Sequence, residues 1–529
     1  MTAQQRGPDA LVVEPVRGVE QACLAARPRS LVDLLEGALP RSGDDVLLVD
    51  PALGTTTTYA QFADLVEGAA AALLGRGLLP GDRVAVLARN GLAAAVGIWA
   101  CARADLVVVG LPVDAPSARL AALLELTDPA LVLAQPELAE AAAQAAGERP
   151  VADAEQVLLA APVAWVPGRP LPAEDETYCL IATSGTTGAP KAVRVTGRMV
   201  GHAAAFYARE LGLRPGDRTA VHLPFAWVSG HVTQLAPAMH SGGSVVTMPG
   251  FSAAALVQTV QEHAVTWLDV VPSIFEMLLR TPGFALPGLG GVRLAVFGGA
   301  PAPPGTLERV RERLPQLRLV DVYALSETCA PVTCLPDVEA LRRPGSVGRP
   351  APYVSLRLVG PDGAVVGRGE AGEVQVLSPT TTPGYWGTDP SPLTEDGWLR
   401  TGDVGRLDDE GYLFVGGRAV DLIIRGGVNV YPAEVERALL ATGLLSDAAV
   451  VGVPSRVAGE QVAAAVVARP GVAVDLGTLQ RAVRDALGAH AVPRPLRVVA
   501  DLPRGGNGKV DREAVRAVVL APVRTTGDP

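Results

Sequence analysis

Short apolar runs, typical of buried strands, alternate along the chain with longer segments that have the spacing of amphipathic helices. This alternation predicts parallel sheets covered by helices. The first series predicts strands at 83–87, 106–109 and 130–133, with helices at 59–75, 91–102, 116–126 and 137–146. The second series predicts strands at 219–223, 267–271, 293–297 and 318–323, with helices at 198–210, 252–263, 273–280 and 305–314. Two such series predict an α/β protein with two doubly wound halves packed together.

The pattern changes twice in the last third of the chain. From about residue 353, short alternating runs (YVSLRLV, GEVQVL and GYLFVGG) separated by Gly and Asp predict a β-rich layer. After Arg418, helices at 433–441 and 476–487 and strands at 448–453, 462–467 and 496–500 predict a compact α+β domain. We therefore expect a poorly ordered arm, a large N-terminal domain, a small C-terminal domain and a tail, over residues 1–29, 30–418, 419–520 and 521–529.

Composition and charge narrow the class of protein. The net charge of −10 and the lack of a long basic run argue against nucleic acid and anionic membranes as partners. The amino terminus has no apolar core of a signal peptide, and the most membrane-like stretch, 92–113, is broken by Arg103 and Asp105, so we expect no membrane span. Five irregularly spaced cysteines without a CxxC pair favour reduced thiols in the cytoplasm.

The stretch TSGTTGAPK, residues 183–191, is the first candidate for chemistry. It lies between two apolar runs, 178–182 and 193–195, that predict strands. Backbone N–H groups and hydroxyls in such a turn can face a phosphate, and Lys191 adds a point charge. An ordinary glycine-rich hairpin has the same composition. The stretch is also not a P-loop signature, because Lys191 is followed by Ala192 rather than by Ser or Thr.

Five more stretches carry candidate residues, although each alone is also typical of an ordinary turn or surface loop. YALSETCA, 323–330, follows a predicted strand at the edge of the sheet where ligands bind in α/β folds, and Glu327 there suits Mg²⁺. In GGAP, 298–301, side-chain-free backbone can lie against a flat ligand. The other three stretches are GWLRTGDVG with Asp403, the segment 417–436 with Arg418, and LPRGGNGKVDR with Lys509.

In this order and spacing, the six stretches resemble the adenylate-forming (AMP-binding) superfamily, over roughly residues 30–515. This superfamily includes acyl-CoA synthetases, adenylation domains of nonribosomal peptide synthetases and luciferases, and the chain is closest in type to the acyl-CoA synthetases. The resemblance implies a large N-terminal domain and a small rotating C-terminal domain. It also implies two half-reactions, in which a carboxylic acid and ATP form acyl-AMP with Mg²⁺, and a thiol then takes the acyl group. The thiol would be coenzyme A or the phosphopantetheine of an acyl carrier protein.

The resemblance also implies a role for individual residues. Lys509 would contact the substrate carboxylate and the bridging phosphate oxygen, Thr183 and Glu327 would hold Mg²⁺, and Arg418 and Asp403 would bind the ribose. Ser326 would bind the α-phosphate, Asp321 would accept from the adenine amino group, and Tyr323 would cover the base. The remaining implied contacts are Ser184, Gly185, Thr186, Thr187, Gly188 and Lys191 with the β- and γ-phosphates, Gly299, Ala300 and Pro301 with adenine, Gly426 and Gly427 with pantetheine, and Trp227 and Gly298 with the acyl group.

Several positions depart from the family pattern. Val420 stands at the hinge, where Asp or Lys is usual, and Ala192 and Ala324 replace glycines. Ala226 has no charge to hold an ammonium group and His231 is a poor substitute, so an α-amino acid substrate is disfavoured. The expected activity is therefore an acyl-CoA synthetase for a fatty or aromatic acid. Two alternatives stay open: a ligase that passes the acyl group to a carrier protein or another nucleophile, and an adenylate-binding protein without catalysis.

Overall fold

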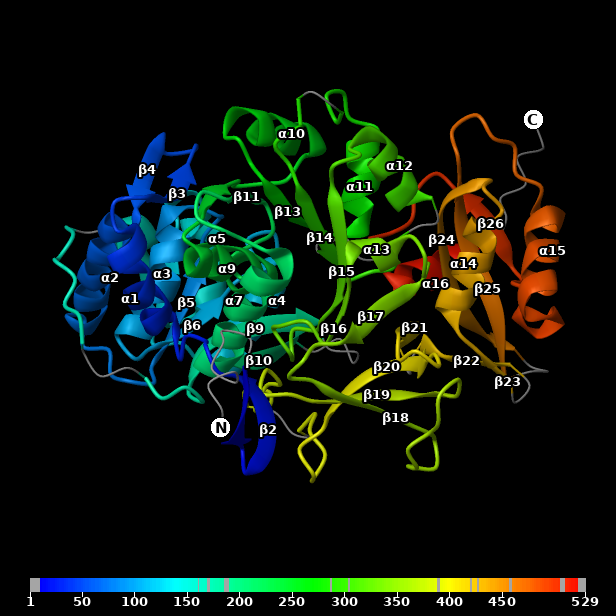
Figure 1. The fold of residues 1–529 in the computed structure, drawn as a ribbon, viewed down its shortest axis with the longest axis horizontal. Coiled ribbons are helices and arrows are strands. Elements are labelled where there is room, and N and C mark those ends of the chain that lie inside the picture. Colours follow the sequence, from blue (N-terminus) through cyan, green and yellow to red (C-terminus); the bar gives the residue numbers. More distant parts are fainter. Residues whose placement is uncertain are drawn as a thin grey trace.

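The computed structural model describes residues 10–159, 161–168, 172–184, 190–285, 288–302, 305–387, 391–418, 421–425, 428–455, 459–504 and 510–521. A large N-terminal part contains two α/β halves side by side, and a smaller α+β part, orange to red in Figure 1, follows at the C-terminal end. The mixed α/β fold with a large and a small domain confirms the predicted fold class.

The first half is built on a six-stranded sheet with the order β10-β9-β6-β5-β7-β8. Its central strands are short and almost wholly apolar, as expected for parallel strands that are buried on both faces. Only β10 runs antiparallel, as the second strand of a hairpin with β9. The strands are β5 (Arg83–Leu87), β6 (Val107–Gly110), β7 (Leu131–Ala134), β8 (Val151–Asp153), β9 (Thr177–Ser184) and β10 (Pro190–Thr196).

The second half is a thirteen-stranded sheet that includes the expected β-rich layer. Its order is β18-β19-β20-β21-β17-β16-β15-β14-β13-β11-β12-β3-β4, so the layer continues the α/β sheet through antiparallel strands instead of standing apart. The strands β3, β4, β12, β16, β17 and β20 were not predicted from the sequence. The bounds are β3 (Val46–Asp50), β4 (Thr55–Thr58), β11 (Arg218–Val221), β12 (Ser244–Thr247), β13 (Trp267–Val270), β14 (Leu294–Gly298), β15 (Arg318–Tyr323), β16 (Thr333–Leu335), β17 (Ser346–Pro350), β18 (Ser355–Val359), β19 (Ala371–Leu377), β20 (Leu399–Leu407) and β21 (Leu413–Arg418).

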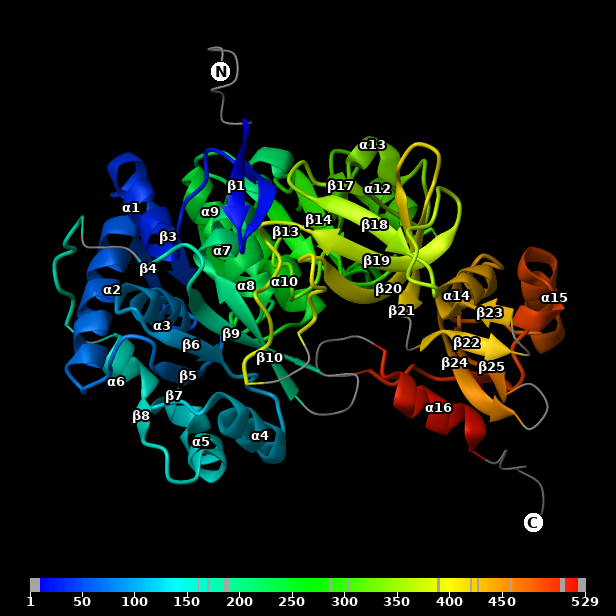
Figure 2. The ribbon, with the colours of Figure 1, turned by 90° about the horizontal axis from the view of Figure 1, so that it is seen from below.

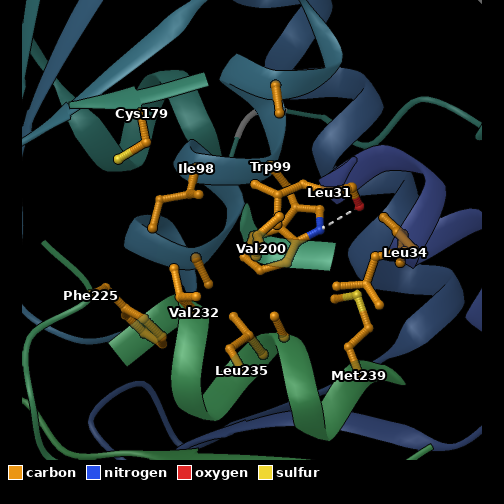
Figure 3. Close-up of a cluster of buried hydrophobic side chains, with 14 of the residues drawn as sticks. Leu31, Leu34, Ile98, Trp99, Cys179, Val200, Phe225, Val232, Leu235 and Met239 are labelled. Atoms are coloured by element: carbon orange, nitrogen blue, oxygen red, sulfur yellow. Dashed lines mark hydrogen bonds between the residues drawn. The ribbon is translucent and has the colours of Figure 1, made fainter. Parts of the chain in front are cut away.

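Helices from both halves meet in one large core around Trp99. Its ring is fully buried, lies edge-on to Phe62 with centroids 5.8 Å apart, and donates from Nε1 to the Leu31 carbonyl at 3.1 Å (Figure 3).

No helix in the described ranges is long and apolar enough to cross a membrane. The helices are α1 (Leu31–Ser42), α2 (Tyr59–Leu74), α3 (Leu92–Arg103), α4 (Ser117–Thr127), α5 (Ala139–Ala146), α6 (Ala154–Leu158), α7 (Gly197–Leu211), α8 (Val228–Gly230), α9 (Ala236–Ser241), α10 (Ala253–Glu262), α11 (Pro272–Leu279), α12 (Thr306–Arg313) and α13 (Asp337–Ala340), with a π-helical turn over His231–Leu235.

The C-terminal part has its own sheet and its own apolar clusters. Asp421 lies 3.4 Å from Arg512 of the last helix, so the chain has already joined this part three residues after β21 ends. Residues 419 and 420, where we expect the domain boundary, lie outside the described residues. The elements are β22 (Ile423–Arg425), β23 (Val428–Val430), α14 (Pro432–Leu440), β24 (Leu445–Ser455), β25 (Gly459–Ala468), α15 (Leu476–Leu487), β26 (Leu496–Val499) and α16 (Arg512–Leu520).

Residues 11–24 form a β-hairpin of β1 (Leu11–Val16) and β2 (Val19–Leu24), where we expected a poorly ordered arm (Figure 2). The hairpin is tied to the large domain by Arg27, whose side chain is fully buried. The Arg27 guanidinium lies 2.6 Å from Glu14 and 2.8 Å from Glu174. Sequence periodicity misses this segment because its order depends on ion pairs with residues far along the chain.

We expect the Glu14 carboxylate to stabilise the fold in a pH-dependent way. Burial alone would raise its pKa, but hydrogen bonds from Arg27 and Arg198 outweigh it and lower the pKa of Glu14 from 4.5 to about 2. A lowered carboxyl pKa contributes stability above the unfolded value of 4.5, and this contribution is lost as the pH falls toward 2. Glu14→Gln should therefore reduce the free energy of unfolding at pH 7 by about 3 kcal/mol.

Urea unfolding at pH 7, 5 and 4 measures this effect. The difference between wild type and Glu14→Gln should narrow below about pH 4.5. Glu20→Gln, an exposed carboxylate on the same hairpin, serves as the control with little effect. A difference of constant size at every pH would contradict the assigned ion pairs.

Candidate active site

The β9–β10 hairpin presents Thr183 and Lys191 side by side. The two residues are directly opposite each other in the antiparallel register, so their side chains emerge on the same face. Both are partly exposed, although Ile181 and Ala192 beside them are buried. The strands on either side of the TSGTTGAPK stretch are therefore confirmed. Its tip, residues 185–189, and the side chain of Ser184 lie outside the described residues.

Tyr385 joins this hairpin to the second candidate stretch, and the sequence reasoning missed it. The Lys191 ammonium lies over the Tyr385 ring, 4.7 Å from its centroid, and the Tyr385 hydroxyl donates to Glu327 Oε1 at 2.8 Å. The backbone at Trp386 also donates to the Ala192 carbonyl at 2.8 Å. A signal was available, because two adjacent aromatic residues in a Gly-flanked turn are unusual in a chain that is only 4% aromatic.

A tight turn after β15 presents Ser326 and Glu327. The Leu325 N–H donates to Thr328 Oγ1 at 3.1 Å, and Cys329 adopts a left-handed conformation with φ of 54°. The Glu327 carbonyl accepts from the Thr382 N–H at 2.7 Å, which fixes the turn against the loop that carries Tyr385. Glu327 is partly exposed, and the Tyr385 hydroxyl donates to one of its two carboxylate oxygens, Oε1. This carboxylate therefore suits Mg²⁺, which prefers oxygen ligands and shares them with substrate phosphates.

Asp403 gathers the residues expected around the ribose. It pairs with Arg418 across β20 and β21, and Arg418 Nε lies 2.9 Å from Asp403 Oδ1. The Tyr323 hydroxyl donates to Oδ2 at 2.5 Å, so the end of β15 meets the same carboxylate. Burial, followed by the Asp403 charge, raises the pKa of Tyr323 well above its usual value, so its hydroxyl keeps its proton. The structure thus brings together three predicted residues that are far apart in sequence.

The GGAP stretch begins at the last residue of β14, directly after Phe297, which pairs with Asp321 on the neighbouring strand β15. Gly299 has φ of 78°, and residues 299–301 are exposed, as a backbone surface for a flat base requires. Gly298 is needed for packing, because a Cβ there would lie 2.2 Å from the Val322 carbonyl oxygen. Burial raises the pKa of Asp321 to about 8. A donor such as the adenine amino group would favour the ionised form of this carboxyl.

The segment 224–229 lies at the junction of the two halves. A Cβ on Gly110 at the end of β6 would come within 2.7 Å of the Ala226 backbone. Trp227 is partly exposed, as expected for an acyl-pocket residue. His231 is fully buried, its Nδ1 lies 2.9 Å from the Phe225 carbonyl, and its Nε2 lies 3.2 Å from the Tyr178 hydroxyl.

His231 thus has protein partners for both ring nitrogens. Burial lowers the pKa of His231 to about 4, so it is neutral near pH 7 and supplies no charge to a substrate. The carbonyl beside Nδ1 places the proton there, which leaves Nε2 to accept from Tyr178.

Several predicted residues lie outside the described residues, so their positions stay predictions. They are Gly185, Thr186, Thr187, Gly188, Val420, Gly426, Gly427 and Lys509.

Comparisons with known proteins identify the family of the chain. The AMP-binding enzyme family matches residues 35–386, and the AMP-binding enzyme C-terminal domain matches residues 434–509. The sulfoacetate–CoA ligase of Cupriavidus necator is 35% identical over 89% of this chain and 94% of its own length. The fatty acid–[acyl-carrier-protein] ligase ScoC of Streptomyces coeruleorubidus is 29% identical over 88% of this chain and 92% of its own length.

A solved structure extends the likeness to three dimensions. The o-succinylbenzoate CoA synthetase of Bacillus subtilis, in complex with its acyl-adenylate intermediate, superimposes with a TM-score of 0.80 at 27% identity. The match covers 92% of this chain and 98% of that one. The chain therefore belongs to the AMP-binding enzyme family, and it carries both the large domain and the C-terminal domain of that family.

Proposed function

We propose that the protein activates a carboxylic acid with ATP to an acyl-adenylate, releases pyrophosphate, and transfers the acyl group to coenzyme A. As a member of its family it is an AMP-forming acid–thiol ligase. The observation that carries the proposal is the continuous contact from Lys191 through Tyr385 to Glu327. Glu327 follows Tyr323 by four residues in the chain, and Tyr323 belongs to the group that it forms with Asp403 and Arg418.

The charges of the site fit the chemistry of this reaction. A carboxylate that approaches ATP brings like charges together, and each pair at ~4 Å costs about 4 kcal/mol at an effective dielectric of ~20. Lys191, which lies over an uncharged aromatic ring, supplies positive charge to the site, whereas the charge of Arg418 is paired with Asp403. Thr183 and Glu327 would hold Mg²⁺, which supplies further positive charge at the phosphates when it is bound. We assign the remaining cation, at the reacting carboxylate, to Lys509.

The substrate we propose is an acid without an α-amino group, fatty or aromatic. Ala226 offers no charge for an ammonium group, and His231 is neutral and already bonded to Tyr178. We also propose a cytoplasmic location, because all five cysteines are unpaired and the reaction consumes ATP.

A second acceptor, the phosphopantetheine of an acyl carrier protein, is favoured by the similarity to the ligase ScoC. Incubation with ATP, Mg²⁺ and a panel of acids, with either free CoA or a holo-carrier protein, separates the two acceptors. Acyl-CoA formation supports our proposal, whereas transfer to the carrier protein alone would favour the second acceptor. Acyl-AMP that neither thiol consumes would exclude both.

Lys509→Ala tests the assignment of the catalytic cation. We expect pyrophosphate release to fall by at least 100-fold, because the positive charge at the developing transition state is lost. ATP affinity, measured by calorimetry, should stay within about threefold, since Lys191 still holds the distal phosphates. Arg504→Ala, which removes a cation of the same stretch that is bound to Asp447, is the matched control and should retain activity. Equal turnover by Lys509→Ala and wild type would contradict the assigned role.

Tyr385→Phe tests the link between Lys191 and Glu327. The ring and its contact with the ammonium remain, but the hydrogen bond to the carboxylate is lost. A hydrogen bond to a charged group is worth about 1.5–3 kcal/mol, so we expect the Mg²⁺ concentration for half-maximal pyrophosphate release to rise about tenfold. Tyr412→Phe, whose ring lies between Arg343 and Arg349, is the control. An unchanged Mg²⁺ requirement would show that Glu327 does not depend on Tyr385.

A further inference from the structure

One carboxylate, Asp269 on β13, stands on an otherwise apolar strand. Leu268 and Val270 point into the cluster formed with helices α10, α11 and α12, whereas Trp267 belongs to the large core beside α7 and α9. Because side chains alternate along a strand, Asp269 shares the face of Trp267 and not that of its two neighbours. The acid therefore points toward α7, the π-helical turn and α9.

In the described part of the chain, only one of the two carboxylate oxygens of Asp269 accepts a hydrogen bond from the protein. Thr233 Oγ1 lies 2.6 Å from Asp269 Oδ2 and 2.9 Å from the Ser229 carbonyl oxygen, and its single proton serves one of these acceptors at a time. Within the described part of the chain, Thr233 supplies the hydrogen bond to Asp269, and Oδ1 has none. Burial raises the pKa of Asp269 to about 7, against the lowering effect of Thr233.

The register of the sheet places Asp269 beside the expected acyl pocket. Asp269 pairs with Val296 on β14, so Gly298 follows two residues further along that strand, on the same face. Ser229 and Thr233 follow Trp227 by two and six residues in the chain. Asp269 is also partly exposed, whereas Trp267 and Val270 on the same strand are buried. Asp269 is thus the partly exposed residue of a strand whose other residues are buried.

We propose that Asp269 binds a hydrogen-bond donor, a hydroxyl or N–H group, on the acyl portion of the acid substrate. This inference rests on the proposed function and names the substrate class for the same site. A donor supplies the hydrogen bond that Oδ1 lacks, and this bond compensates the desolvation of the carboxylate. An acid with a second anionic group would instead bring like charges together in a partly buried place. We therefore expect hydroxylated or N–H-bearing acids to be preferred over both unsubstituted and dianionic acids.

Matched acids of equal chain length or ring size test the proposal by pyrophosphate release. The panel pairs phenylpropanoic with hydroxyphenylpropanoic acids, fatty acids with their hydroxy derivatives, and each with the corresponding dicarboxylic acid. For wild type we expect at least one hydroxylated member to exceed its unsubstituted partner at least tenfold in kcat/KM, because a site that hydrogen-bonds a hydroxyl rejects the analogue without it.

Asp269→Val and Asp269→Asn identify the residue responsible for this preference. In Asp269→Val the ratio of kcat/KM values within a matched pair should fall to about 1 or reverse, whereas Asp269→Asn, which keeps an acceptor oxygen, should retain part of it. A ratio within one variant does not depend on the folded fraction of that preparation. Thr233→Val is the companion variant, and it should weaken the preference less because Oδ1 is untouched.

The outcomes distinguish this inference from the proposed function. If wild type activates acids but shows no preference within any pair, or the preference survives in Asp269→Val, the inference is wrong and the ligase activity stands. A preference for the dicarboxylic members would also overturn it. If wild type releases no pyrophosphate with any acid, while ATP still binds, the proposed function itself fails.

Discussion

The site depends on a cation and an anion being held near each other without neutralising each other. Tyr385 achieves this, because the face of its ring attracts the Lys191 ammonium and its hydroxyl donates to Glu327. A direct ion pair would satisfy both groups and leave less charge for a ligand. With the tyrosine between them, neither charge is used up in a direct ion pair, which fits the proposed roles of the ammonium at phosphate and of the carboxylate at a metal ion. The same residue links the β9–β10 hairpin to the turn after β15.

Local chemistry made part of this arrangement predictable from the sequence. The two strands around the TSGTTGAPK stretch followed from apolar runs. Asp403 and Arg418 were singled out by their short motifs, but the turn predicted at Asp403 is wrong, because both residues lie in paired strands, β20 and β21. Tyr385 could not be placed in the same way, because no periodicity marks a loop residue whose partners are 58 residues or more away in sequence. Asp269 was missed for the opposite reason. Its strand is so apolar that the run predicts an ordinary core element, and one acid within it changes no period.

The fold shows the same division between local and distant causes. Strand–helix alternation predicted the parallel sheets, but β3 and β4 join the second half although they precede every strand of the first half. β3 and β4 lie at the end of the thirteen-stranded sheet, beside β12. The pattern of residues 46–58 does not show which of the two sheets these strands join. The β1–β2 hairpin likewise owes its order to Arg27, which is buried between Glu14 of the hairpin itself and Glu174 of a distant segment. Such a buried cation is tolerated only where its partners are already in place.

The use of lysine in this chain bears on the assignment of the cations. The sequence has 45 lysine and arginine residues, and only Lys191 and Lys509 among them are lysines. Arginine serves wherever a cation contacts a surface carboxylate, a carbonyl or an aromatic ring elsewhere in the fold. A planar guanidinium spreads its charge over several donors, whereas an ammonium is a compact point charge that fits beside a single oxygen. The two lysines of a chain that otherwise uses arginine lie in its two glycine-rich candidate stretches, which fits the proposal that a compact cation is needed there. The proposed role of Lys509, at a carboxylate and a phosphate oxygen as they react, is one that such a cation suits.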